Sequence, residues 1–326
     1  MTPVDTDAGV EALLPHWEAL WRTTPGATPF QSPRWLLPWW RVWGNGRPLV
    51  ACRWEGGRLT GVLPCYVFAG AAGDRLLPMG AGVTDYLDAL GAAPGALVSG
   101  LLRAAAGAGI GRCDLSDVVP GSALPDVDPG PGWRADWTRG SACPVLPLAP
   151  GGGWLPHKMR RNLALARNRA ARLGPVTLEH ATADGLDEAL DRLAALHQGR
   201  WTGKGEAGVM ADPLVVRFHR EAAPGLLAAG LLRLSLLRVG GEVAAACLAL
   251  LDRGRIHFHL SGFDVTRRAI SPGVLLFGAL LEEATGEGRS EAHFLRGAEG
   301  YKYGWGARDR FNATGSFTVV AGGAGR

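Results

Sequence analysis

Two neighbouring arginines, Arg267 and Arg268, stand just before Ser271, which opens a Ser-Pro-Gly run. Serine is a favoured N-cap residue and proline is favoured in the first turn of a helix, so the run predicts a helix start. The N–H groups of Gly273 and Val274 then have no acceptor within the helix, and the helix dipole adds positive potential around them. These features favour a site for an anion such as a phosphate. An ordinary serine N-cap with solvated arginines is the alternative interpretation.

Two histidines, His257 and His259, lie two residues apart on a predicted strand and are therefore expected to share one of its faces. Imidazole titrates near neutral pH, so one of them, with His259 as the candidate, is suited to act as a general base. A histidine packed in the core or partly exposed on a strand is the commoner situation and stays the alternative.

Five further polar residues occur at places where a ligand would meet the sheet. Asp264, Arg296 and Glu299 come near the ends of predicted strands, where ligands of open α/β sheets gather, so we expect them to contact the substrate. In the first half, Asp85 and Asp88 are candidates for binding a cationic or polyol acceptor. For Glu299, the alternative is that it only forms an ion pair with Arg296. For Asp85 and Asp88, the alternative is that they only form a turn beside glycines, and this interpretation is slightly preferred.

The elements that must position these residues are clearest in the second half, where apolar residues follow helical and strand periodicities. In the first half, Ser32 and a proline precede a tryptophan stripe at helical spacing, which predicts a helix packed in the core. The predicted helices cover residues 33–43, 95–108, 158–173, 185–198, 213–223 and 271–285, with a short one near 301. The predicted strands cover residues 49–54, 59–68, 176–180, 231–239, 243–251, 256–262, 291–295 and 311–320.

Residues 121–153 contain six prolines and seven glycines, a composition that disfavours a continuous helix or strand. We therefore expect a linker there, with one domain at 1–150 and a second at 151–326. The first part carries 11 of the 34 Lys+Arg and 13 of the 30 acids, which leaves 23 basic residues against 17 acids in the second. An anionic ligand is therefore expected in the second domain.

The composition excludes several classes of protein. With 47% hydrophobic and 20% charged residues over 326 positions, the chain is expected to be globular. Acids near the N-terminus and the lack of a long apolar run predict a soluble, cytoplasmic protein without a membrane span. Five scattered cysteines without a CxxC pair predict neither disulfides nor a zinc site. No Walker loop, Rossmann fingerprint, HExxH or nucleophile elbow occurs, so nothing in the sequence supports an NTPase, a dehydrogenase, a metalloprotease or a serine hydrolase. The expected function uses no metal.

Four short runs resemble one family of acyltransferases: residues 261–264 (Ser-Gly-Phe-Asp), 271–273 (Ser-Pro-Gly), 294–297 (Phe-Leu-Arg-Gly) and 301–306 (Tyr-Lys-Tyr-Gly-Trp-Gly). Over residues 155–326 the chain is similar to GNAT acyltransferases of the cellulose-biosynthesis (CelD-like) branch, relatives of the Fem peptidyltransferases. Residues 29–35 and 84–88 resemble the leading domain of the same families. The resemblance implies an α/β (α+β) fold of tandem GNAT-like domains, each with a mixed, mostly antiparallel sheet flanked by helices, the first copy being degenerate.

The resemblance also implies roles for single residues. The donor, acetyl-CoA or another acyl-CoA used as co-substrate, would place its pyrophosphate at the helix start, on the predicted anion site. The run departs from the R-x-x-G-x-G pattern of the family, because Ser271 replaces the first glycine and the proline after it donates no N–H. In this family a tyrosine after the fifth strand protonates the leaving thiolate, which points to Tyr301 or Tyr303. By likeness to the Fem proteins, Lys302 would contact the donor or its oxyanion, a surface lysine being the alternative.

The leading hypothesis is an acyl-CoA-dependent N- or O-acyltransferase, with an N-acetyltransferase as the expected kind. It would act by direct transfer on a sugar, an amino-sugar or another small polar metabolite. A Fem-like transferase that uses aminoacyl-tRNA to form an amide bond is the second hypothesis, favoured by six basic residues and no acid over 158–172. A catalytically silent GNAT-fold binding protein of polysaccharide biosynthesis is the third.

Overall fold

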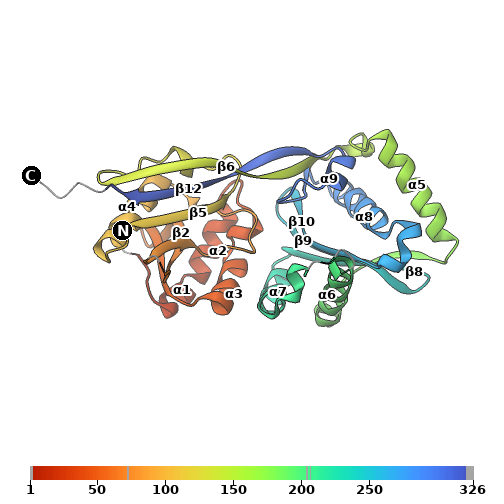
Figure 1. Cartoon of the computed structure of the whole chain (residues 1–326), viewed down its shortest axis with the longest axis horizontal. Helices are drawn as coiled ribbons and strands as arrows, with labels where there is room; N and C mark the ends of the chain where they lie inside the picture. The colour runs from red at the N-terminus through yellow and green to blue at the C-terminus, as the bar shows by residue number, and fades with distance from the viewer. Residues whose placement is uncertain (1–2, 72, 203–204, 206, 321–326) are drawn as a thin grey trace, which may run out of the picture. The chain divides into compact units, whose positions relative to one another are not determined.

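The structure, a computed structural model, describes residues 3–71, 73–202, 205 and 207–320. Contacts divide the chain into two compact units (Figure 1). Unit 1 comprises the chain up to Ser141 together with the chain from Phe311, and unit 2 comprises Ala142–Arg310. Two long strands, β6 (Trp133–Pro147) and β12 (Arg308–Val319), contribute residues to both units. The domain boundary expected at residue 150 stays a prediction.

The linker expected over residues 121–153 is wrong, because β6 occupies its second half. The prolines and glycines concentrate at the two ends of the segment, and the residues between them alternate. Trp133, Ala135 and Trp137 pack against the core of unit 1, and their neighbours point away from it. Averaging the composition over the whole segment concealed this period-2 pattern.

Unit 1 contains a mixed sheet with the strand order β1-β2-β3-β5-β12-β6. The helix α4 packs against β1 and β2, with Leu97, Leu101 and Ala105 buried at helical spacing. The predicted tryptophan helix is α3, in which Trp35 and Trp39 are buried. The elements before β6 are α1 (Asp7–Ala12), α2 (Leu14–Thr23), α3 (Pro33–Trp43), β1 (Arg47–Glu55), β2 (Arg58–Phe68), β3 (Arg75–Pro78), β4 (Leu90–Gly91), α4 (Pro94–Gly107) and β5 (Arg112–Val118).

Unit 2 contains the helices and strands that were expected between residues 151 and 310, within a few residues of the expected bounds. The last expected strand, over residues 311–320, is β12, most of which belongs to unit 1. Its sheet order is β6-β11-β10-β9-β8-β7, antiparallel except for the β10–β11 pair. The elements are α5 (His157–Ala171), β7 (Val176–His180), α6 (Leu186–Thr202), α7 (Pro213–Ala228), β8 (Leu232–Val239), β9 (Glu242–Leu251), β10 (Arg255–Phe263), α8 (Pro272–Gly286), β11 (Glu291–His293) and α9 (Gly300–Gly304).

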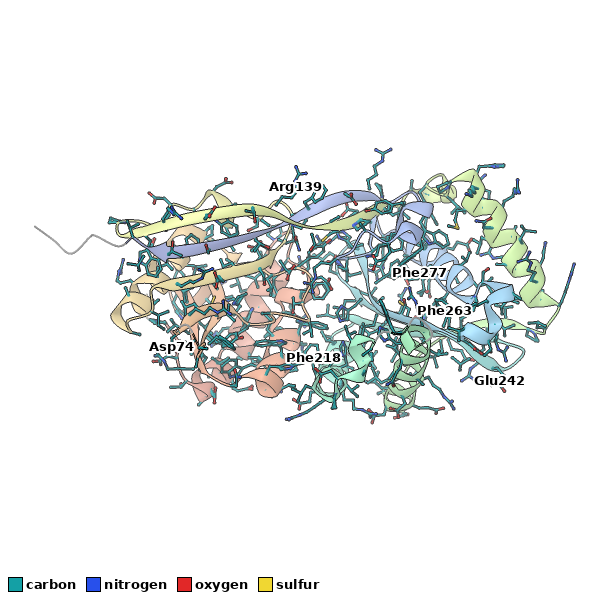
Figure 2. The ribbon with its side chains drawn as sticks, viewed as in Figure 1. Asp74, Arg139, Phe218, Glu242, Phe263 and Phe277 are labelled. Atoms are coloured by element: carbon teal, nitrogen blue, oxygen red, sulfur yellow. The ribbon has the colours of Figure 1, made fainter. Side chains whose placement is uncertain are left out.

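The two faces of the unit 2 sheet carry different helices. Figure 1 shows α5 and α8 on one face and α6 and α7 on the other. Figure 2 shows the same division in side chains, with Phe263 and Phe277 on the α8 side of the sheet and Phe218, on α7, on the other side. The helix α5 buries one stripe, Met159, Leu163, Ala166 and Ala170, against this core and leaves its basic residues exposed.

Candidate functional site

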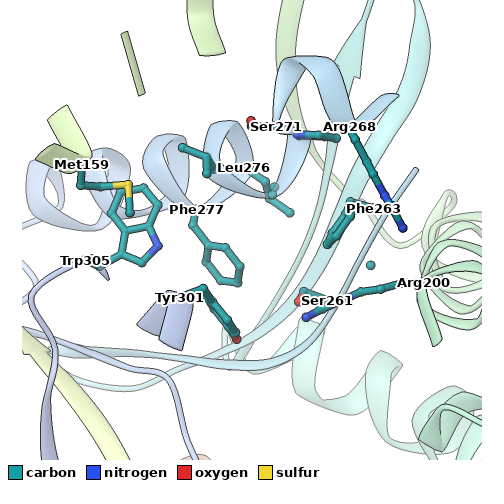
Figure 3. Close-up of a pocket in the computed structure, with 14 residues that line it drawn as sticks. Met159, Arg200, Ser261, Phe263, Arg268, Ser271, Leu276, Phe277, Tyr301 and Trp305 are labelled. Carbon is teal, nitrogen blue, oxygen red and sulfur yellow. The ribbon is translucent and has the colours of Figure 1, made fainter. Parts of the chain in front are cut away.

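A cavity of about 430 Å³ opens in unit 2 where two parallel strands part (Figure 3). The strand β11 pairs with β10 only from Arg255 to His257 and ends at His293, whereas β10 continues to Phe263. The free end of β10, the start of α8 and the helix α9 surround the space. Its lining residues are Met159, Arg200, Ser261, Gly262, Phe263, Arg268, Ser271, Pro272, Gly273, Val274, Leu276, Phe277, Tyr301 and Trp305.

The start of α8 lines the cavity, but its serine does not cap the helix as expected. Ser271 is left-handed, with φ 52° and ψ 60°, and its side chain makes no cap hydrogen bond. A capping serine needs an extended backbone, so the left-handed conformation removes this role. Non-glycine residues pay about 1–3 kcal/mol for such a conformation, which is therefore a source of strain at the cavity wall.

The predicted anion site at the α8 start is smaller than the sequence suggested. The N–H of Val274 donates to the carbonyl oxygen of Ser271 at 2.9 Å, which leaves the N–H of Gly273, a residue that lines the cavity, as the remaining candidate donor of the two. Arg268 is exposed, lines the cavity and has no ion pair among the described residues. Arg267 does not line it, since its guanidinium pairs with Asp264 at 3.3 Å and donates to a β8 carbonyl.

A second arginine, Arg200, enters the same cavity from α6. Its guanidinium carbon lies 5.1 Å from the ring centre of Phe263, in cation–π range. In Figure 3 the side chain points from α6 to Ser261 and toward Tyr301. Although 38% of the Tyr301 surface is exposed, partial burial raises its pKa above the ordinary value of 10.0, and the charge of Arg200 acts against that rise. The guanidinium is therefore within electrostatic reach of the tyrosine hydroxyl.

Of the two candidate tyrosines, only Tyr301 lines the cavity. Its ring packs against Phe277 and Phe294 at centroid distances of 5.9 and 6.3 Å, which fixes its orientation. The hydroxyl of Tyr303 instead donates to Asp309 at 2.8 Å, on an exposed part of the surface. The geometry thus brings one tyrosine to the site and uses the other elsewhere.

Lys302 is buried, with 2% of its surface exposed, and does not line the cavity. Its Nζ donates to the carbonyl oxygens of Leu295, Arg296 and Gly297 at 3.2, 2.7 and 3.0 Å, and it pairs with Glu299 at 2.8 Å. These contacts occupy the ammonium within the protein, and its expected contact with the donor or the oxyanion stays a prediction. The lysine instead holds the loop after β11, in which Leu295 has a positive φ of 58°.

The histidine proposed as a base lies on the opposite side of β10. His259 stands at a register shift of β10, and its Nε2 lies 3.2 Å from Nε2 of His219 on α7. His257 is fully buried and bonds Asp252 at 2.8 Å. Neither histidine lines the cavity, which agrees with the interpretation of packed strand histidines.

The remaining expected substrate residues do not line the cavity either. Asp264 caps a short turn by accepting from the N–H and hydroxyl of Thr266. Glu299 is 55% exposed and pairs with Lys302, and Arg296 is half-buried in the loop that this lysine holds.

In unit 1, Asp85 is buried, and Asp88 accepts hydrogen bonds from the Ser122 hydroxyl and the Ala89 N–H. Burial raises the pKa of Asp88 to about 6. The Asp88 contacts are internal to unit 1, and binding of an acceptor by Asp85 and Asp88 stays a prediction.

Sequence reasoning missed Arg200 and the aromatic wall of the site. Ser261 and Phe263 belong to a run that carried the family resemblance, so a signal for them existed. Arg200 had none, because its place on α6 looks like any exposed helical position. The position of Arg200 depends on Gly262, because a Cβ on this residue would lie 2.3 Å from the backbone nitrogen of His197. Only glycine therefore lets α6 approach β10 this closely.

Two searches of the described residues bear on cofactors and membranes. No cluster of three or more histidine, cysteine or acidic side chains in the described ranges is arranged to hold a metal ion. Within the same ranges, none of the helices has both the length and the apolar character for crossing a bilayer.

Comparison with known proteins gives the relationships of the chain. Residues 157–303 match the family described as acetyltransferase (GNAT) domain. No functionally curated protein matches the sequence. Among solved structures, FemX superposes with a TM-score of 0.69 at 11% identity, covering 98% of both chains.

Two further structures show the same fold at low identity. L-PGS from Bacillus licheniformis gives a TM-score of 0.61 at 13% identity, covering 99% of this chain and 95% of that one. The C-terminal domain of a putative lysylphosphatidylglycerol synthetase from Agrobacterium fabrum gives 0.60 at 15% identity, covering 95% and 92%. The expected mixed α/β, tandem GNAT-like fold is confirmed. The chain thus has a FemX-like fold, and its residues 157–303 match the acetyltransferase (GNAT) domain family.

Proposed function

We propose that the protein transfers an acyl group from an acyl-CoA to the amine or hydroxyl of a small polar acceptor, such as an amino-sugar, within the unit 2 cavity. One observation carries this proposal: the helix start with Gly273 and Arg268, and the hydroxyl-bearing ring of Tyr301, line one continuous space between the parted strands. A phosphate-binding end and a proton donor in one cavity are what direct transfer from a thioester requires.

The donor's diphosphate would bind the N–H of Gly273 and the guanidinium of Arg268. The apolar arm of the donor would then lie along the aromatic wall formed by Phe263 and Phe277. The strain at Ser271 is consistent with this role, because strained backbone is concentrated at ligand sites.

In the transfer step the acceptor nitrogen attacks the thioester carbonyl carbon, a C–N bond forms and the C–S bond breaks. The thiolate takes a proton from the Tyr301 hydroxyl, and the acceptor nitrogen releases its proton to water in the open cavity. Tyr301 then recovers a proton from solvent. A tyrosine hydroxyl is protonated at neutral pH, as an acid requires, and the raised pKa of Tyr301 moves its ionisation further from neutrality.

Aminoacyl-tRNA as donor is the second candidate, and the surface of α5 favours it. Lys158, Arg161 and Arg172 are exposed and have no acidic partner in the parts of the chain that the structure describes. By contrast, Arg167 pairs with Glu282, and Arg169 donates to a backbone carbonyl. Such a surface would attract a polyanion such as RNA.

Thermal unfolding in the presence of each donor tests the two candidates. Acetyl-CoA or a longer acyl-CoA should raise the Tm of the wild type, since a ligand of the native state stabilises it by mass action. Arg268→Gln should weaken this binding about tenfold, and Arg267→Gln should leave donor affinity within twofold. No shift with any acyl-CoA, together with salt-sensitive binding of charged tRNA, would replace the first candidate by the second.

A binding protein without catalysis remains the third candidate. It predicts a donor-induced shift without any turnover. Acyl transfer by the wild type that is lost in Tyr301→Phe would exclude it.

A further inference from the structure

We propose that Arg200 is the specificity residue of the site and that it binds a negatively charged group, a carboxylate or a phosphate, on the acceptor. This inference rests on the proposed function and names the class of substrate that the function leaves open. The juxtaposition that carries it is a cavity-facing guanidinium beside Ser261 and Tyr301, brought there by the close approach of α6 to β10 (Figure 3).

Arg200 has no structural task that accounts for its position. Most arginines of unit 2 form ion pairs, as Arg192 does with Glu188 and Arg220 with Asp191 on neighbouring helical surfaces. Arg200 has no ion pair and no hydrogen bond within the described residues, and its contacts are the ring faces of Phe263 and Trp201. Those rings hold the guanidinium in place and leave its N–H donors available to an anion, in the fork geometry that suits carboxylates and phosphates.

The charge of Arg200 affects the titration of groups at the proposed transfer centre. It acts on the pKa of Tyr301 and, behind burial and the Lys302 hydrogen bond, on the pKa of Glu299. An anion bound to Arg200 would therefore lie beside the tyrosine that we assign to the leaving thiolate. In an acyl-CoA the arm between the diphosphate and the thioester carries no charge, so an anion at this point belongs to the acceptor.

The proposed phosphate site of the donor is separate from Arg200, which supports assigning the anion at Arg200 to the acceptor. Arg268 and the N–H of Gly273 are at the α8 start, and Arg200 comes from α6 on the other face of the sheet. One cavity thus contains two cationic groups that come from different elements. The simplest explanation is that each of them binds an anionic group of a different substrate.

The test compares acceptors that differ only in an anionic group. Glucosamine 6-phosphate is compared with glucosamine, and serine with serinamide, as acceptors for acetyl-CoA with the wild type, Arg200→Gln and Arg200→Lys. Arg192→Gln, an exposed arginine on the same helix, is the matched control. Dividing each variant's kcat/KM by that of the wild type for the same acceptor cancels the intrinsic reactivity of the amines.

We expect kcat/KM of Arg200→Gln to fall at least 30-fold for the charged acceptors and less than threefold for the uncharged ones. Arg200→Lys should recover part of the loss, and Arg192→Gln should behave as the wild type. Equal losses for both members of each pair would overturn the proposal. So would a weaker acetyl-CoA-induced Tm shift in Arg200→Gln, because Arg200 would then serve the donor.

The same compounds decide the question by binding if none of the four is acylated. A charged member that raises the Tm of the wild type, but not of Arg200→Gln, supports the anion site, and identical responses of the two proteins overturn it. Failure of the proposed function has a different signature, namely no response of the wild type to any acyl-CoA.

Discussion

Gly262 on β10 faces the backbone of His197 on α6 so closely that a Cβ on the glycine would lie 2.3 Å from the histidine nitrogen. The obstacle is backbone, which cannot rotate away as a side chain can. Arg200 follows His197 by about one helical turn, so the approach that Gly262 permits also delivers the guanidinium to the cavity.

Gly262→Ala should therefore force α6 away from β10. We expect a loss of about 2 kcal/mol in the free energy of unfolding, as overpacking of a dense core typically costs. Gly199→Ala on α6 is the control, because its Cβ would meet nothing within 4 Å and alanine favours helix over glycine. Urea denaturation measures both. Unchanged stability of Gly262→Ala would contradict the close packing.

The Lys302→Met variant should have a lower free energy of unfolding than the wild type and should also lose activity. The change leaves the carbonyl groups of Leu295, Arg296 and Gly297 without their donor, which costs about 3 kcal/mol or more in stability. Lys158→Met, at an exposed position of α5, should stay within about 0.5 kcal/mol of the wild type. A variant with wild-type stability and a low kcat would instead indicate direct contact of Lys302 with the reacting group.

Ser271→Gly should stabilise the protein by about 1 kcal/mol. Glycine adopts a positive φ without the steric cost that serine pays there, and the serine side chain makes no cap bond that would be lost. Ser271→Ala keeps the steric cost and should show no gain. Thermal unfolding of the two variants, run side by side, gives the comparison. An equal gain in stability in Ser271→Ala and Ser271→Gly would argue against backbone strain.

Tyr301→Phe should lower kcat by a factor of about 100 or more, the usual contribution of a general acid, with little change in Tm. Tyr303→Phe, whose hydroxyl is bonded to Asp309 outside the cavity, should retain kcat. Because burial raises the pKa of Tyr301, the acid stays protonated above pH 10, and the wild-type rate should show no alkaline limb from this group below that pH. A limb that appears near pH 9 and vanishes in Tyr301→Phe would contradict the raised pKa, whereas an unchanged kcat in Tyr301→Phe would refute the assignment of Tyr301 as the acid.

Low pH should destabilise unit 2, because the buried His219 binds a proton more weakly in the folded chain than in the unfolded chain. Burial, aided by the charge of His259, lowers the pKa of His219 to about 3, whereas the unfolded chain binds that proton near pH 6.5. The unfolded state thus holds more protons between these values, so stability falls as the pH drops from about 6.5 toward 3. His219→Phe should flatten this dependence, and His157→Phe at an exposed site should not. Unfolding followed from pH 8 to pH 4 measures the slopes.

The sequence alone determined the elements and part of the site. Apolar residues at helical or alternating spacing located α8 and the β8–β10 meander, because such periodicity is a local property of a few turns or pleats. The Ser-Pro-Gly run located the start of α8, and the aromatic run after β11 located Tyr301. Arg268 and Gly273 could be predicted as an anion site for the same reason, since a helix start is built from consecutive residues.

Only the tertiary structure decided which side chains meet. The burial of Lys302 in a ring of carbonyls, the pairing of His259 with α7 and the entry of Arg200 into the cavity each join segments that are distant in the sequence. Such contacts depend on how closely packed elements approach one another. At β10 that distance is set by the missing side chain of Gly262, which no local pattern distinguishes from any other glycine.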